Sequence, residues 1–281
     1  MFLTIGTVIL IAIAAIAIAL ARSGVTDSPK PVSRLKTEDY HSLVMASDNQ
    51  DILFFGHHEG VLRSPDGGET WRAVAGLRAD AMSLVASEQS PKIIYLAGHE
   101  VLMKSLDGGS TWQNLANNLP GLDLHWFAVN PDDHNKLYAS AVGFGFFSSG
   151  DGGATWARWN PRLPAGASLT TMAILGREPL RMLAGTKEGR LLYSEDGGAS
   201  WQERGELGSG VTAFALKRDT KTIYAGTTNG VYRSEDARSW MRLPLETTVA
   251  ALAVGREEPA HVVVVSNKGN VFRSDDGGQT W

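Results

Sequence analysis

After residue 21, the chain alternates short apolar runs with clusters of Gly, Asn, Asp and Pro. The runs are rich in β-branched and aromatic residues, as in Ser42–Ala46, Ile52–Phe55 and Val61–Ser64, and runs bounded in this way indicate β-strands. No apolar repeat with the period of a helix extends over a useful length in this part of the chain. We therefore predict an all-β domain.

One stretch recurs and divides the runs into groups. Its first copy, Ser64–Trp71, has the sequence SPDGGETW, and we call each copy a repeated turn. The other copies are Ser105–Trp112, Ser149–Trp156, Ser194–Trp201, Ser234–Trp240 and Ser274–Trp281. The central aspartates are Asp66, Asp107, Asp151, Asp196, Asp236 and Asp276, at successive spacings of 41, 44, 45, 40 and 40 residues. The copy at Asp236 lacks the glycines and is one residue shorter. Six copies at this period indicate a repeat architecture.

The residue types of the repeated turn fit a structural role. An aspartate can accept hydrogen bonds from backbone N–H groups of its own turn, and two glycines permit positive φ angles. The tryptophan is expected to open the next strand and to offer a large surface for burial against a neighbouring repeat. Six of the eight tryptophans occupy this position. The repeated turn is therefore informative about the fold rather than the function.

These copies are similar to Asp-box (BNR) repeats, and the chain resembles the Asp-box β-propellers from its first repeated turn to its last residue. Sialidases and other glycoside hydrolases, sortilin-like receptors and photosystem II assembly factors belong to that superfamily. Each repeat here contains four short strands, so the resemblance implies a six-bladed β-propeller. The six central aspartates then have a structural role.

The end of the chain poses a problem of closure. The last residue, Trp281, stands where the outer strand of the sixth blade should begin, and the blade would be left with an unpaired edge. Counting back 41 residues from Trp71 leads to Lys30, so Pro31–Leu35 occupies the equivalent outer-strand position ahead of the first blade. We predict that this segment pairs with the sixth blade and closes the ring.

Candidate functional residues lie in the loops that enter the first strand and leave the second strand of a blade. These loops share the channel mouth, while the repeated turns lie on the opposite face. The predicted ligand-binding residues are Asp39, His41, His57, Asp80, His99, Asp123 and His125. At the ends of the second strands, blades four to six carry only Thr186, Thr227 and Ser266. Residues two apart on a strand point the same way, so Asp39 and His41 can act together. His134 and His261 are expected on the surface elsewhere.

Three interpretations of the channel mouth are open. In the first, the residues simply fill polar positions at strand ends, without a ligand. Four of them, His41, His57, His99 and His125, could bind zinc or another divalent transition metal, with carboxylates nearby. Asp39, Asp80 and Asp123 could supply the two carboxyl groups, roughly 5–9.5 Å apart, that glycoside hydrolysis requires. The Asp-x-His and Gly-His segments are most similar to bacterial exported propellers classed as glycosyl hydrolases mainly on the strength of their repeats, and nothing in the sequence marks one of the three aspartates as a catalytic acid.

The N-terminal segment Met1–Ala21 is apolar and uncharged, and as a helix it would be about 30 Å long, enough to cross a bilayer. An uncleaved transmembrane signal anchor is favoured over a signal peptide because no Lys or Arg precedes the run. Cleavage after Ala19-Leu20-Ala21 would instead give a secreted protein. Residues 22–28 are a linker and residues 29–281 the propeller. Arg22 and Lys30 favour a cytoplasmic propeller, but long folded domains translocate regardless of charge, and the resemblance favours a location in the periplasm or at the cell surface.

Composition narrows the function further. A net charge of −4 without a basic run gives no general attraction to nucleic acid. The absence of cysteine excludes disulfides, zinc–thiolate sites and a lipoprotein anchor. We predict a monomeric, membrane-tethered propeller that binds a protein, glycan or small ligand at its channel mouth without catalysis. A glycoside hydrolase using the same face is the alternative, and a histidine-based metal site is the third hypothesis.

Overall fold

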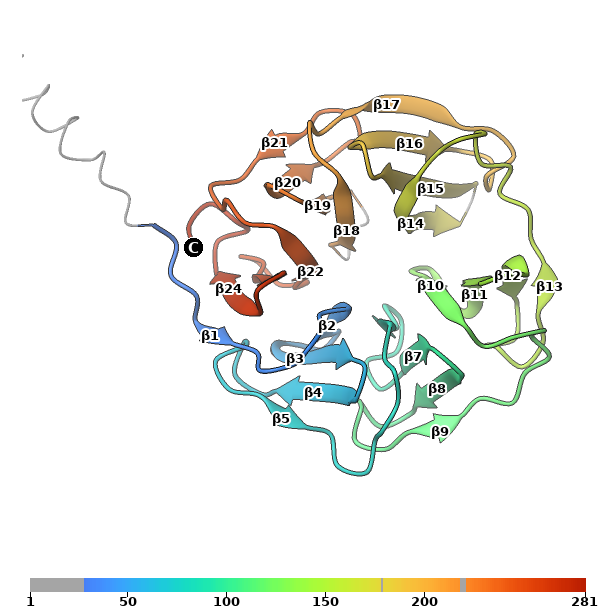
Figure 1. Ribbon diagram of the computed structural model, residues 1–281, viewed down its shortest axis with the longest axis horizontal. Helices are drawn as coiled ribbons and strands as arrows, with labels where there is room; N and C mark the ends of the chain where they lie inside the picture. Colours follow the sequence, from blue (N-terminus) through green and yellow to red (C-terminus); the bar gives the residue numbers. More distant parts are fainter. Residues whose placement is uncertain (1–27, 178, 218–220) are drawn as a thin grey trace, which may run out of the picture. The chain divides into compact units, whose positions relative to one another are not determined.

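A computed structural model describes residues 28–177, 179–217 and 221–281. Residues Pro31–Trp281 form one compact unit, and within the described ranges the chain forms strands, turns and loops but no helix. The strands make six four-stranded antiparallel sheets arranged as the blades of a β-propeller (Figure 1). The fold class is therefore as predicted. The predicted membrane helix Met1–Ala21 lies outside the described residues, and no helix within them is long and apolar enough to cross a membrane.

In the first five blades the strands follow one another outward from the channel in chain order, and in the sixth the outer strand comes from the N-terminal segment. The first three blades are β2 (Ser42–Ala46), β3 (Asn49–His57), β4 (Gly60–Ser64) and β5 (Arg72–Ala73); β6 (Ser83–Ala86), β7 (Ile94–Gly98), β8 (Val101–Ser105) and β9 (Gln113–Asn114); and β10 (Leu124–Asn130), β11 (Asp133–Ala141), β12 (Gly145–Ser149) and β13 (Ala157–Arg158). The fourth and fifth are β14 (Leu169–Arg177), β15 (Leu180–Thr186), β16 (Arg190–Ser194) and β17 (Gln202–Glu206); and β18 (Val211–Leu216), β19 (Ile223–Thr227), β20 (Gly230–Ser234) and β21 (Met241–Arg242). The sixth is β22 (Val249–Val254), β23 (Val262–Ser266), β24 (Asn270–Ser274) and β1 (Ser33–Arg34).

The ring is closed by the N-terminal segment. Strand β1 pairs antiparallel with β24, with Ser33 opposite Val271. The pairing is extended by bonds from the Val32 amide to the Val271 carbonyl and from the Leu35 amide to the Gly269 carbonyl, both 2.8 Å. Figure 1 shows blue β1 beside red β24, so the two ends of the domain complete one blade. The predicted closure is confirmed.

The core lies between the blades rather than within each sheet. Six apolar clusters each combine residues of two adjacent blades. In one of them Trp156 packs against Phe127 at 6.3 Å between ring centroids, and Phe127 packs against Tyr95 of the preceding blade. The tryptophans of the repeated turns therefore fill the spaces between blades, as predicted. One detail differs, because β5 begins at Arg72 and Trp71 precedes the outer strand instead of opening it.

Hydrogen bonds within the repeated turn explain its sequence. Asp66 accepts bonds from the Thr70 amide (2.9 Å), the Thr70 hydroxyl (2.6 Å) and the Ser64 hydroxyl (2.8 Å). Gly67 and Gly68 have φ angles of 70° and 97°, a region that favours glycine. The Gly67 amide donates to the Asp51 carbonyl near the start of β3. The repeated turn thus lies beside the loop joining the first two strands, away from the loop that follows β3.

Candidate functional site

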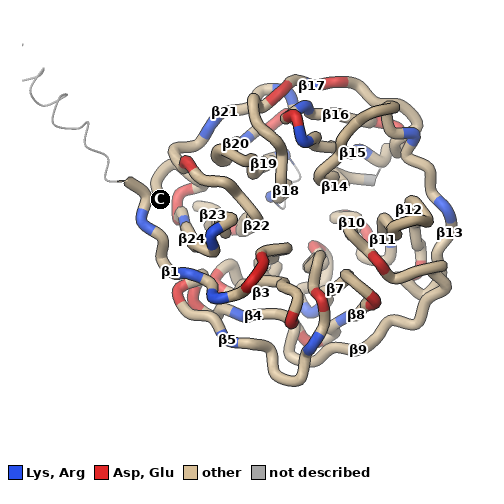
Figure 2. Tube along the Cα trace, viewed as in Figure 1, with Lys and Arg blue, Asp and Glu red and all other residues tan. Residues whose placement is uncertain are grey.

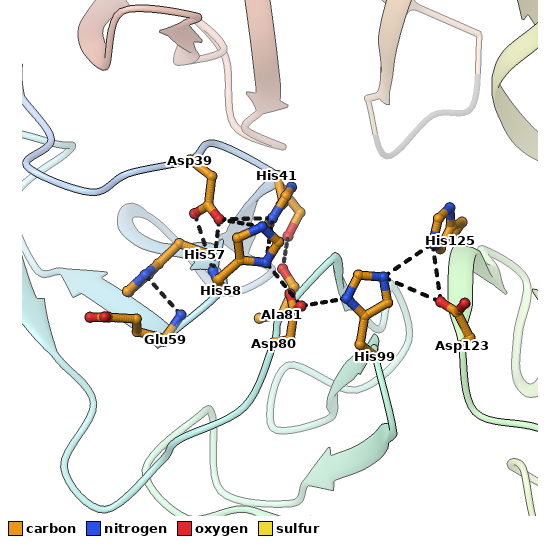
Figure 3. A network of polar contacts seen from close by, with 11 residues as sticks. Asp39, His41, His57, His58, Glu59, Asp80, Ala81, His99, Asp123 and His125 are labelled. Atoms are coloured by element: carbon orange, nitrogen blue, oxygen red, sulfur yellow. Dashed lines mark hydrogen bonds and ion pairs between the residues drawn. The ribbon is translucent and has the colours of Figure 1, made fainter.

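Carboxylates and imidazoles of the first three blades meet at one end of the channel (Figure 3). We call this group the Asp–His array; in order along the rim its members are His41, Asp39, His58, Asp80, His99, Asp123 and His125. Neighbouring members contact each other through ring nitrogens and carboxylate oxygens. Figure 2 shows Lys and Arg mixed with Asp and Glu around the ring, whereas the array combines carboxylates with histidines.

The blade architecture places these side chains. Asp123 directly precedes β10, and its carbonyl accepts a hydrogen bond from the Val142 amide in the loop after β11. The equivalent bond in blades four, five and six is accepted by the carbonyls of Ser168, Gly210 and Thr248. The position that carries a carboxylate in the third blade therefore carries a small residue in the next three. The array occupies the arc formed by the first three blades.

His58 lies between two carboxylates. Its Nε2 is 2.8 Å from Asp39 Oδ2 and its Nδ1 is 2.9 Å from Asp80 Oδ2. The hydrogen bond to Asp80 and the charges of both carboxylates outweigh desolvation and raise the pKa of His58. Burial acts to raise the pKa of Asp80, but hydrogen bonds from His58 and His99 outweigh it, and the pKa of Asp80 is lowered. Both ring nitrogens of His58 thus serve as hydrogen-bond donors, and the ring favours the imidazolium form.

A different arrangement occurs around His99. Its Nδ1 is 2.6 Å from Asp80 Oδ2, and its Nε2 is 3.1 Å from His125 Nε2 and 3.3 Å from Asp123 Oδ1. His125 Nε2 is in turn 3.0 Å from Asp123 Oδ1. This carboxylate oxygen is shielded from solvent and accepts no hydrogen bond from the described residues. Three potential ligand atoms therefore converge, and of their contacts only the one between the two Nε2 atoms is a hydrogen bond.

His41 is the first member of the array. Its Nε2 lies 3.2 Å from Asp39 Oδ2 and 3.2 Å from His58 Nδ1. Burial lowers the pKa of His41, with the nearby Asp39 charge acting in the opposite direction. His41 therefore favours the neutral imidazole at the edge of the array.

The array includes six of the seven predicted ligand-binding residues, and His57 is the exception. Only 9% of His57 is exposed, and its Nδ1 accepts a bond from the Glu59 amide at 3.3 Å. Its side chain points away from the array (Figure 3) and lines a groove of about 540 Å³ with Leu35 and Trp71. Burial lowers the pKa of His57. The structure places His58 in the array instead.

His57 and His58 differ in their position within the repeat. Strand β3 ends at His57 and β7 ends at Gly98, so His58 and His99 are the equivalent residues that follow. Both stand eight positions before the central aspartate of their repeated turn, Asp66 or Asp107. Counting from the turn would have selected His58 from the sequence alone. His134 and His261 lie outside the array: His134 contacts Gln89. His261, predicted on the surface, is only 15% exposed and lies between Asp51 and Asp275.

The channel beside the array has room for a small molecule. A cavity of about 300 Å³ is lined by the inner strands of all six blades and includes His41, His125 and Trp126. Three overlapping groups of the array bring potential metal ligands within 4.8 Å of one another: Asp39, His41 and His58; His58, Asp80 and His99; and His99, Asp123 and His125. The site can therefore offer both charged hydrogen-bonding partners and metal ligands.

No protein-family model and no curated protein matches the chain. Solved structures share its fold: a GH74 xyloglucanase from Xanthomonas campestris superposes with a TM-score of 0.61 at 18% identity, over 90% of this chain and 46% of that one. YCF48 from Cyanidioschyzon merolae gives a TM-score of 0.57 at 14% identity, over 88% and 98% of the two chains. YCF48 bound to D1 peptide gives 0.53 at 14% identity, over 86% and 93%. The chain thus spans about half the length of the xyloglucanase, and the shared feature is the β-propeller fold.

Proposed function

We propose that the chain is a membrane-tethered, extracytoplasmic Asp-box propeller that binds a partner or small ligand at its channel mouth without catalysing a reaction. The observation that carries this proposal is the Asp–His array. All six blades follow one plan, and closure of the ring requires no such array on one side. The simplest explanation of a localised group of carboxylates and imidazoles that faces the channel is that it binds a ligand.

The surroundings of the array favour a macromolecular partner. Val142 and Phe144, 46% and 42% exposed, lie in the loop between β11 and β12, and the Val142 amide is bonded to the carbonyl of Asp123. Exposed apolar side chains beside charged groups are typical of protein interaction surfaces. The similarity in fold to YCF48, which has been solved with a bound peptide, supports a protein or peptide as the first partner to test.

The sequence supports the rest of the proposal. The uncharged segment Met1–Ala21 is long enough for a membrane anchor, and the resemblance of the chain to exported Asp-box propellers supports a location outside the cytoplasm. The identification of the repeated turns as Asp boxes is supported by the bonds that Asp66 accepts within its own turn.

A glycoside hydrolase is the second candidate, favoured by the similarity in fold to the xyloglucanase. Asp39, Asp80 and Asp123 would be its candidate carboxyl groups. A general acid needs a raised pKa, whereas hydrogen bonds from His58 and His99 outweigh the opposing effect of burial and lower the pKa of Asp80. The environment of Asp80 therefore favours binding over acid catalysis.

Site-specific photocrosslinking tests the proposed function. A photoreactive amino acid replaces Phe144 near the channel mouth or Leu106, which is 54% exposed in a repeated turn, in the full chain in its own cell membranes. We expect a discrete adduct from position 144 and its loss when His58 and His99 are both changed to alanine. An adduct from position 106 alone, or one from position 144 that the double variant retains, would contradict the proposal.

A hydrolysis assay separates the two candidates. The purified full chain is incubated with xyloglucan, and newly formed reducing ends are measured. We expect none above a control without protein. If the parent chain produces reducing ends and the Asp80→Asn and Asp123→Asn variants do not, the chain is a glycoside hydrolase and the binding proposal is wrong.

A further inference from the structure

We propose that His99, Asp123 and His125 bind one divalent transition-metal ion, such as zinc, and that Asp80 positions His99 for this role. The inference deepens the proposed function and rests on it, because the ion would be a ligand of the same channel mouth. It selects one of the three Asp/His groups, and the selection follows from the contacts that each group makes.

The three ligand atoms form a compact triangle. The sides are 3.1 Å between the two Nε2 atoms, 3.3 Å from His99 Nε2 to Asp123 Oδ1, and 3.0 Å from His125 Nε2 to Asp123 Oδ1. Ligand atoms bound to a tetrahedral zinc ion at about 2.0–2.1 Å lie about 3.3 Å from one another. Binding therefore requires the side chains to move apart by only a few tenths of an ångström, or about one tenth of the present spacing.

Asp80 sets the orientation of His99. A distance of 2.6 Å between His99 Nδ1 and Asp80 Oδ2 fits a hydrogen bond donated by the ring nitrogen to the carboxylate. In the neutral imidazole the proton then resides on Nδ1, and Nε2 presents its lone pair to Asp123 and His125. A carboxylate that holds a ligating histidine through its other nitrogen is a recurring feature of metal sites.

Asp123 provides the second, independent indication. Its Oδ1 is shielded from solvent, lies beside two ring nitrogens and accepts no hydrogen bond from the described residues. The Asp123 side chain as a whole is 47% exposed, so leaving this one oxygen without a hydrogen bond carries only part of the cost of a buried charge, and a cation beside it is stabilising. An ion bonded to this oxygen and to both Nε2 atoms would supply that stabilisation.

The other two groups both include His58, whose ring nitrogens are already engaged. Both ring nitrogens of His58 face carboxylates, Asp39 on one side and Asp80 on the other. Both oxygens of Asp39 also accept bonds from the His58 amide, at 3.1 and 3.3 Å. A histidine that donates from both nitrogens has no lone pair for a metal. His99 Nε2 also faces a carboxylate, Asp123, but at 3.3 Å and without a hydrogen bond, so the group of His99, Asp123 and His125 keeps nitrogens that no carboxylate bond occupies.

The donor set also indicates the class of ion and the state of the site. Two imidazoles and one carboxylate suit zinc and similar transition metals, whereas magnesium and calcium prefer oxygen ligands. Three protein ligands leave a fourth position in a tetrahedral site. The His125 side chain is 51% exposed, so this position is accessible to a donor group of the partner.

Metal titration tests the inference. The purified full chain is freed of metal with a chelator and titrated with zinc chloride by calorimetry, alone and with excess magnesium. We expect one zinc ion per chain, undisturbed by magnesium. His125→Ala removes a ligand and should weaken binding at least about 100-fold, and Asp80→Asn, which weakens the support of His99, by about 10–100-fold. His134→Ala is the matched control, because His134 lies in the same blade beside Gln89 and away from the array, and it should bind zinc as the parent chain does.

The outcomes distinguish this inference from the proposed function. Thermal unfolding of each variant first establishes that it is folded. Zinc binding that survives His125→Ala, or that is lost in His134→Ala, would overturn the assigned site. Failure of the parent chain to bind zinc, with the adduct at position 144 intact, would remove the metal and leave the binding proposal standing. Zinc binding without any adduct would support the metal site and contradict a protein partner.

Discussion

Two adjacent histidines, His57 and His58, occupy opposite electrostatic environments. His57 is the last residue of β3 and is buried, so its charged form is desolvated and its pKa is lowered. His58 is more than half exposed between Asp39 and Asp80, and the hydrogen bond to Asp80 leads the effects that raise its pKa. Sequence proximity therefore gives these residues no common role, and only His58 belongs to the array.

Titration by NMR can resolve this pair. In metal-free protein, we expect the pKa of His58 to lie above the ordinary value of about 6.5 and that of His57 to lie below it. Asp80→Asn removes a negative charge and replaces a carboxylate acceptor with a weaker, neutral amide, so the pKa of His58 should fall while that of His57 changes much less. The chemical shifts of the ring carbon-bound protons against pH give both values. Coincident titration of the two rings would show that the assigned environments are wrong.

Most of the array could be predicted from the sequence, since the Asp-x-His segments recur at equivalent places in the repeat. Asp39, Asp80 and Asp123 each precede an inner strand, and topology brings such positions to one face. The choice between His57 and His58 failed for a physical reason, because successive side chains of a strand point in opposite directions. An error of one residue therefore moves a histidine from the channel mouth to the space between blades. The contacts within the array depend on rotamers, which the sequence pattern does not specify.

At the scale of the single element, part of the stability of the repeated turn depends on the ionised form of its aspartate. In the third turn, hydrogen bonds from the Thr155 hydroxyl and amide, with further bonds from the Ser149 hydroxyl and the backbone, lower the pKa of Asp151 to about 2. In the second turn, hydrogen bonds from the Thr111 side chain and amide are the main cause that lowers the pKa of Asp107, again to about 2. These bonds favour the carboxylate form.

Acid should therefore weaken the ring. The unfolded pKa of an aspartate is about 3.9, above the folded value of about 2 for Asp151, so the unfolded state binds more protons between these values. The stabilisation is complete above about pH 4 and is lost as the pH falls through about 2. Urea unfolding of the parent chain and of Asp151→Asn, at pH 6 and pH 3, measures the effect. The variant should be less stable at pH 6 but lose less stability on acidification; equal losses would exclude the contribution of Asp151.

The tryptophan of each turn links that element to the neighbouring blade, and its substitution should reveal how firmly the turn holds it. Trp156 is buried, and its Nε1 donates to the Gly153 carbonyl at 2.9 Å. Trp156→Ala should cost about 3–5 kcal/mol through the cavity it leaves. Trp240 is half-buried, its Nε1 has no hydrogen-bond acceptor among the described residues, and Ala237 in its turn has a φ of 57°. Trp240→Ala should therefore cost less, and equal losses in denaturant titrations would contradict this ranking.

At the scale of the whole molecule, six blades could be predicted because each repeated turn is a local element that recurs at nearly constant spacing. The closing strand could be located as well, since Pro31–Leu35 stands at the outer-strand spacing ahead of the first repeated turn and pairs with β24. The width and lining of the channel could not be predicted in the same way. They depend on how six blades pack around one axis, and the cavity beside His41 and Trp126 is a property of the closed ring.

The closure itself can be tested at the edge between β1 and β24. The Val32 amide donates to the Val271 carbonyl at 2.8 Å, while its side chain is exposed. Val32→Pro removes the donor and should lower the free energy of unfolding by about 1 kcal/mol or more, whereas Val32→Ala keeps the amide and should change it by less than about 0.5 kcal/mol. Deletion of residues 29–36 removes β1 and buried Leu35 and should destabilise the domain further, because β24 would become an unpaired edge. Thermal unfolding of the full chain and the three variants measures this order. A deletion variant that melts with the parent chain would show that the ring does not depend on its N-terminal strand.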